Sequence, residues 1–89
     1  MGRNLTLADE TVIDGGEAGY SQGFLWCYIN GFTLQQAALI FFDADKTSRI
    51  DFHYGEMVDT YEGYTNCISL KVDADGMVSV CLTKGANNV

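Results

Sequence analysis

Residues 68–82, ISLKVDADGMVSVCL, carry the strongest structural signal in the sequence, because two runs of alternating apolar residues flank a short polar turn. Such alternation is typical of strands with one buried face. A three-residue loop, Ala74-Asp75-Gly76, keeps the apolar side chains of both runs on the same face, and Gly76 supplies the left-handed residue that this loop requires. The stretch therefore predicts an antiparallel β-hairpin. Its expected pairs are Val72 with Val78, Leu70 with Val80, and Ile68 with Leu82.

Upstream of this hairpin, further short apolar runs separated by turn residues predict more strands. The run at 24–29 is apolar on both faces, which is typical of a central strand covered on both sides. Glycines at 15, 16 and 19 favour a loop over regular structure. The remaining expected strands are 4–7, 11–13, 50–54 and 57–61, so that the chain from Ser48 onward forms a β-meander.

One helix is expected, over residues 34–42. Thr33 and Gln36 have the spacing of a capping box, in which each side chain accepts a hydrogen bond from a backbone N–H at the helix start. The apolar stripe recurs at the intervals of one helix face. It consists of Leu34, Ala37, Ala38 and Phe41.

These elements predict one domain, residues 1–89, with an α+β fold. We expect a single antiparallel sheet of five to six strands, a β-meander, with one α-helix packed on a face. Residues 85–89 are expected to fray. The expected core residues are Phe24, Trp26, Leu34, Phe41, Ile50, Phe52, Leu70, Val78 and Val80.

Composition excludes several classes of function. Twelve acidic against five basic residues give a net charge of −7, which argues against direct binding of nucleic acid or of an anionic membrane. No run of 18 apolar residues is present, and the N-terminus lacks the apolar stretch of a signal peptide. The three cysteines, an odd number without CxxC spacing, are expected to be free thiols in a reducing compartment. Together these features predict a cytoplasmic protein.

No motif indicates catalysis, a metal site or a cofactor. Residues 43–54 begin like a calcium-binding loop, but Ser48 replaces the glycine of the sharp turn and Tyr54 replaces the closing glutamate. His53 and Asp51 share a strand face, yet no nucleophile motif accompanies them. We therefore expect a protein that is not an enzyme and that binds neither metal nor cofactor.

Charge segregation is the most informative functional feature. Between Ile50 and Leu70 the chain has four carboxylates and three tyrosines but no lysine or arginine. Carboxylates accelerate encounter with a basic protein, and tyrosines supply contact area. An acidic face that only confers solubility is the alternative. The predicted partner-binding residues are Asp51, Glu56, Asp59, Tyr61, Glu62 and Tyr64.

The opening residues 5–13, LTLADETVI, resemble the "ITLADGT-hydrophobic" start of small uncharacterised proteins encoded by bacteriophages and prophages, with Glu10 in place of the usual glycine. The order of the following elements is similar as well. The resemblance implies a phage origin. It also implies one of two roles, either a virion component or an inhibitor of host defence.

The leading functional hypothesis is a non-enzymatic inhibitor that blocks a basic site of a bacterial defence protein, such as an anti-CRISPR-like protein. The alternative is a small structural component of a phage tail or head, acting through self-association into a homo-oligomer. A third possibility is a small-ligand binder with a pocket between the Gly15–Gly23 segment and Trp26.

Overall fold

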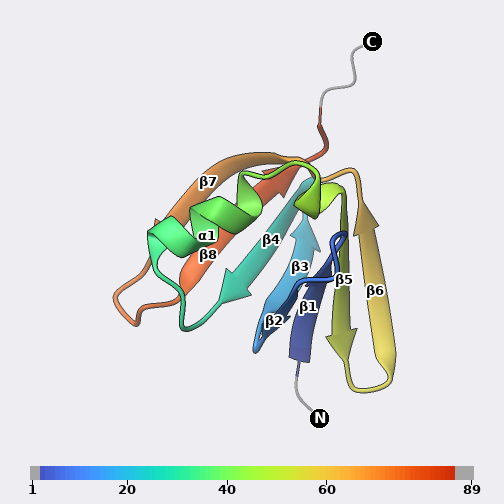
Figure 1. Ribbon diagram of the computed structural model, residues 1–89, viewed down its shortest axis with the longest axis horizontal. Coiled ribbons are helices and arrows are strands. Elements are labelled where there is room, and N and C mark those ends of the chain that lie inside the picture. Colours follow the sequence, from blue (N-terminus) through green and yellow to red (C-terminus); the bar gives the residue numbers. More distant parts are fainter. Residues whose placement is uncertain (1–2, 86–89) are drawn as a thin grey trace.

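The computed structural model describes residues 3–85, which form eight strands, one α-helix and one short 3-10 helix. The strands make two four-stranded antiparallel sheets (Figure 1). Sheet A has the order β2-β1-β5-β6 and contains β1 (Arg3–Leu7), β2 (Val12–Asp14), β5 (Arg49–Tyr54) and β6 (Met57–Glu62). Sheet B has the order β3-β4-β8-β7 and contains β3 (Glu17–Ser21), β4 (Phe24–Ile29), β7 (Asn66–Val72) and β8 (Val78–Thr83). The helices are α1 (Leu34–Phe41) and η1 (Lys46–Ser48).

The prediction of an α+β fold with one sheet of five to six strands is wrong, because the described residues are mostly strand and the strands separate into two sheets. The expected β-meander from Ser48 onward is also wrong, since β5 and β6 belong to one sheet and β7 and β8 to the other. Part of the error is the segment expected to be a loop, which contains β3. Its glycines erase the apolar alternation that marks a strand. The turn to β4 is a two-residue hairpin turn in which Gln22 and Gly23 both have positive φ, 56° and 85°. The rest of the error comes from pairing between strands that are distant in the sequence, since β1 pairs with β5 and β4 pairs with β8.

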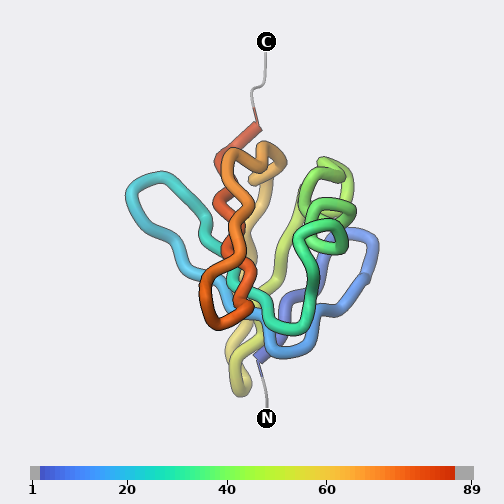
Figure 2. Tube along the Cα trace, turned by 90° about the vertical axis from the view of Figure 1, so that its left-hand side faces the viewer, coloured from blue at the N-terminus to red at the C-terminus, as the bar shows by residue number. Residues whose placement is uncertain are grey.

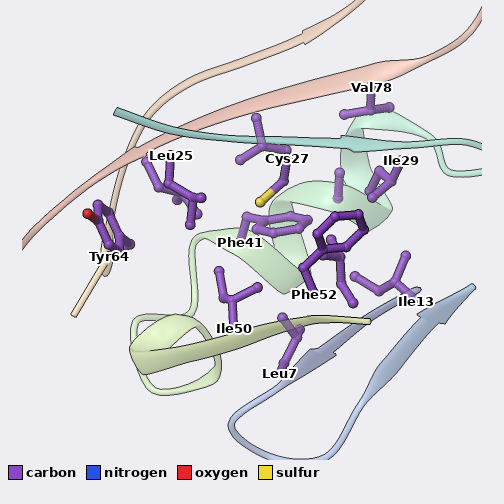
Figure 3. Close-up of a cluster of buried hydrophobic side chains, with 14 residues drawn as sticks. Leu7, Ile13, Leu25, Cys27, Ile29, Phe41, Ile50, Phe52, Tyr64 and Val78 are labelled. Atoms are coloured by element: carbon purple, nitrogen blue, oxygen red, sulfur yellow. The ribbon is translucent and has the colours of Figure 1, made fainter. Parts of the chain in front are cut away.

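The hydrophobic core lies between the two sheets (Figure 3). From β4 it takes Leu25, Cys27 and Ile29, each with no exposed surface. The other face of β4 points outward, so that Phe24 and Trp26 are only half-buried. Their assignment to the core is therefore wrong, because a strand that is apolar on both faces gives no sequence signal for which face is inside.

Helix α1 packs against β7 and β8 on the same side of sheet B as sheet A. Figure 2 shows it, in green, on the opposite side of the molecule from the projecting β3–β4 hairpin, in cyan. Ala37 and Phe41 are fully buried, whereas Leu34, expected in the core, is 40% exposed. The predicted capping box is confirmed. Gln36 N donates to Thr33 Oγ1 and Thr33 N donates to Gln36 Oε1, both at 3.0 Å.

The cap leads to a testable prediction. Thr33→Ala should lower the free energy of unfolding by about 1 kcal/mol, because it leaves the backbone N–H of Gln36 without its acceptor. Thr33→Ser keeps the hydroxyl and serves as the control. Urea denaturation of the three proteins measures the effect. Equal stability of the alanine and serine variants would show that the cap contributes nothing.

The β7–β8 hairpin confirms most of the register expected from the sequence. Val72 pairs with Val78 and Leu70 with Val80, and Gly76 has a φ of 84°. Ile68 does not pair with Leu82, however, because a β-bulge shifts the register between Cys67 and Ser69. Cys67 takes the place opposite Leu82, and Ile68 is 52% exposed. The expected fraying of residues 85–89 concerns, apart from Gly85, positions outside the described residues.

Candidate functional site

Five of the six predicted partner-binding residues lie on the β5–β6 hairpin, residues 49–62, which we call the acidic hairpin. It forms one margin of the molecule, and its tip lies at the same end as the start of β1 (Figure 1). The turn is Gly55-Glu56, with φ of 60° at Gly55. A glycine at the first central position is the requirement of a type II′ hairpin turn. Five of the six residues of β6 are exposed.

The acidic residues of this hairpin do not share one face. Asp59 and Tyr61 pair with Phe52 and Ile50, so they lie on the face of sheet A that carries the core. Asp51 and Glu62 lie on the outer face, and Glu56 is at the tip. Tyr64, which follows β6, is 7% exposed and offers little surface to a partner. The carboxylates therefore flank the strand on both sides.

Asp51 is the one carboxylate of the acidic hairpin with partners inside the described structure. Its Oδ1 accepts from Thr60 Oγ1 at 2.8 Å and from Arg49 Nε at 3.2 Å. Burial alone would raise the pKa of Asp51, but the hydrogen bonds from Thr60 and Arg49, with the Arg49 charge, outweigh burial and hold that pKa below its ordinary value. Asp51 is thus a structural anion, ionised at neutral pH.

This ionisation predicts a pH dependence. A lowered folded-state pKa contributes stability above the unfolded value near 3.9, and that contribution is lost as the pH falls through the folded value. Asp51→Asn should therefore be less stable than the parent protein at pH 7, with a difference that narrows below about pH 4. Urea titrations at several pH values measure it. The control is Asp14→Asn, at an exposed position with no side-chain hydrogen bond to the described residues. If the loss in free energy of unfolding caused by Asp51→Asn did not change with pH, Asp51 would not be a stabilising anion.

A cluster of tyrosines lies beside the end of β6. The Tyr64 ring makes edge contacts with Tyr61 and with Tyr20 of β3, with centroids 6.3 and 6.0 Å away. Lys84 Nζ lies 5.4 Å from the Tyr64 ring centroid. A shallow hollow of about 430 Å³ is lined by Thr60, Tyr61, Glu62, Tyr64 and Lys84. Sequence reasoning missed Tyr20 and Lys84, because only the packing of the two sheets brings them to this place.

A second hollow, of about 560 Å³, lies on the outer face of sheet A. It contains Asp51 and His53, which share a face as the sequence predicted. Thr6 lies directly opposite Asp51 on β1. The lining residues include no serine and no cysteine, so this hollow holds neither a serine hydroxyl nor a cysteine thiol as a nucleophile. The lining is Thr6, Leu7, Ala8, Glu10, Val12, Arg49, Asp51 and His53.

The other candidates for chemistry have structural roles. Asp43, the first residue of the calcium-like stretch, accepts backbone N–H bonds from Asp45 and Lys46, and residues from Arg49 onward form β5 instead of a loop. No group of three histidine, cysteine, aspartate or glutamate residues within residues 3–85 is placed to hold a metal ion. The segment proposed to form a ligand pocket with Trp26 is a strand, in which Gly19 pairs with Trp26.

The three thiols are free and are protonated at neutral pH. Burial raises the pKa of Cys27 to about 12, and it raises the pKa of Cys67 and of Cys81 as well. Protonated thiols are poor nucleophiles and poor metal ligands. Cys27 and Cys81 therefore act as small apolar side chains in the packing.

Comparison of the chain with protein-family models, with curated proteins and with solved structures found no match. The resemblance of residues 5–13 to phage-encoded proteins accordingly stays a prediction. No helix in the described part of the chain has the length and hydropathy to cross a lipid bilayer.

Proposed function

We propose that this protein is a non-enzymatic binding protein that recognises a basic protein partner through the acidic hairpin. One observation carries the proposal. The exposed carboxylates of Glu56, Asp59 and Glu62 make no ion pair with the described residues, and β6 carries no lysine or arginine. Asp51, by contrast, is already paired with Arg49. Unpaired like charges on a rigid hairpin are available to a partner of opposite charge, which they steer and orient.

The phage resemblance suggests what the partner is. We propose a nucleic-acid-binding protein of a bacterial defence system, met in the cytoplasm of the host cell and blocked at its basic site. The carboxylates would compete with nucleic acid for that site. Tyr54, 50% exposed and stacked on Phe52 at 5.5 Å, and the half-buried Tyr61 would add contact area with little loss of side-chain entropy. No cofactor is needed for this role.

The test compares two triple variants by affinity capture from bacterial lysate. The first removes the hairpin charges with Glu56→Gln, Asp59→Asn and Glu62→Gln. The matched control removes three exposed charges elsewhere, with Asp14→Asn, Asp45→Asn and Asp75→Asn. We expect the parent protein and the control to capture a basic defence protein and to inhibit its binding of nucleic acid. The hairpin variant should do neither, and capture should weaken as salt rises. Equal capture by both variants would overturn the proposal.

Self-association as a virion component is the second candidate. Leu39 and Phe42, 75% and 62% exposed, lie on the outward side of α1 and favour it. Light scattering of the pure protein distinguishes the two proposals. A defined oligomer that is insensitive to salt, and that is lost in Leu39→Ser with Phe42→Ser, would support the virion role.

A further inference from the structure

The two sheets expose four edge strands to solvent or to a partner: β2, β6, β3 and β7. Unpaired strand edges invite other chains to pair with them, and proteins protect them with short length, bulges, proline or charged side chains, lysine above all. Strand β2 has three residues. Strand β7 has the bulge at Cys67/Ser69 and carries Lys71. Strand β3 has Gly19 at its centre, and its Glu17 is tied to Arg3 at 3.0 Å.

Strand β6 has only charge among these protections, because its exposed Asp59 and Glu62 repel an acidic strand but attract a basic one. It is six residues long, pairs with β5 in unbroken register from Met57 to Glu62, and contains no lysine, proline or glycine. Among residues 3–85, β5 is the only strand hydrogen-bonded to it. Its open edge is therefore long and regular enough to accept another strand.

The register shows which backbone groups face that open edge. In a hairpin closed by a two-residue turn, the pair that flanks the turn exchanges hydrogen bonds, and so does every second pair after it. Tyr54 with Met57 is that first pair, followed by Phe52 with Asp59 and Ile50 with Tyr61. The N–H and C=O groups of the intervening residues point away from β5. These residues are Val58, Thr60 and Glu62.

The distribution of charge indicates how an occupant would lie. Asp59 is on one face of β6 and Glu62 is on the other, so a partner docked flat on either face would reach only one of them. A strand added at the edge presents successive side chains to both faces, because strand side chains alternate. Basic side chains on such a strand would meet a carboxylate on each side. Another copy of this chain would bring its own net charge of −7 to the same edge and be repelled.

We propose that an extended segment of the partner, with lysine or arginine on both of its faces, pairs with β6 as a fifth strand of sheet A. Backbone hydrogen bonds would supply affinity and the carboxylates would supply selectivity for basic segments. This inference rests on the proposed recognition of a basic partner and specifies its mode.

Two peptides test the inference on the intact protein. The first is a ten-residue peptide in which pairs of adjacent lysines alternate with a threonine-valine pair, so that both faces of the extended strand carry lysine. The second has the same sequence and charge but N-methyl groups at all of its internal backbone nitrogens, which removes the donors from both edges of the strand. Fluorescence anisotropy should give a dissociation constant about tenfold weaker for the methylated peptide. A neutral peptide with glutamine in place of lysine should also bind more weakly.

Amide hydrogen exchange of the unmodified protein locates the peptide. The first peptide should protect the N–H groups of Val58, Thr60 and Glu62. Thr60→Pro removes one of these donors without breaking the ladder to β5, and Thr60→Val loses the same hydroxyl but keeps the donor. We expect weakened binding in the proline variant, with most of the affinity retained in the valine variant.

The outcomes separate the mode of binding from the proposed function. Equal binding of methylated and unmethylated peptides would overturn strand addition and leave charge recognition intact. Failure of every basic peptide to bind would count against both. Hydrogen exchange is also measured without peptide at several protein concentrations. If the same three amides became more protected as the concentration rose, the occupant would be a second copy of the chain, and the inference would be overturned.

Discussion

Replacing Phe41 with alanine is expected to lower the free energy of unfolding by about 3–5 kcal/mol. Phe41 has no exposed surface and lies in the centre of the core (Figure 3). It extends from the end of α1 into the space between the sheets, so its removal leaves a cavity lined by residues of both. The hydrogen-bonded ladders fix the backbone of each sheet, so the residues around the cavity can collapse into it only in part.

The neighbouring residue provides a matched control. Phe42 is 62% exposed, and Phe42→Ala removes the same atoms without opening a cavity in the core. Its effect on stability should be about 0.5 kcal/mol or less. Guanidinium denaturation followed by the fluorescence of Trp26 compares the two variants. Similar losses at both positions would mean that α1 does not seal the core as described.

Gly16→Ala is expected to lower the free energy of unfolding by about 1–3 kcal/mol. A Cβ at this position would lie 2.9 Å from Leu5 Cγ and 3.3 Å from the carbonyl oxygen of Ile13. Leu5 is fully buried, so its side chain can move only by displacing other core residues. The glycine is thus required by close packing between the β2–β3 turn and β1.

Gly19→Ala is the control for this substitution. Gly19 has room for a Cβ, with no heavy atom within 4 Å, and its φ is not in the left-handed region. Alanine there should leave stability unchanged or raise it slightly, because glycine weakens a strand interior. Thermal unfolding by circular dichroism ranks the variants. A Gly16→Ala protein as stable as Gly19→Ala would contradict the close approach to Leu5.

Local patterns in the sequence predict the helix and the hairpins β5–β6 and β7–β8, but not the hairpin β3–β4. The capping box at Thr33, the three-residue loop ending at Gly76 and the turn at Gly55-Glu56 each depend on residues within a few positions of one another. Turn and cap chemistry is local, so it is readable from the sequence.

Features that depend on distant residues were not predictable in the same way. Strand β4 pairs with β8 across about fifty residues of the chain, and this pairing decides which face of β4 is inside. The contacts of Tyr20 and Lys84 with Tyr64 likewise exist only after the sheets pack. At the acidic hairpin, the sequence predicted the exposed carboxylates but not that they lie on opposite faces of β6.

The alternation of hairpins between the two sheets has a consequence for how the chain folds. The hairpins β1–β2 and β5–β6 belong to sheet A, whereas β3–β4 and β7–β8 belong to sheet B. Each half of the chain therefore contributes one hairpin to each sheet, and the central pairs β1–β5 and β4–β8 join the halves. Neither half contains a complete sheet, so a fragment ending after α1 has two isolated hairpins and nothing to close over them. Folding must wait for contacts between the two halves, which makes it slow for a protein of this size and all-or-none.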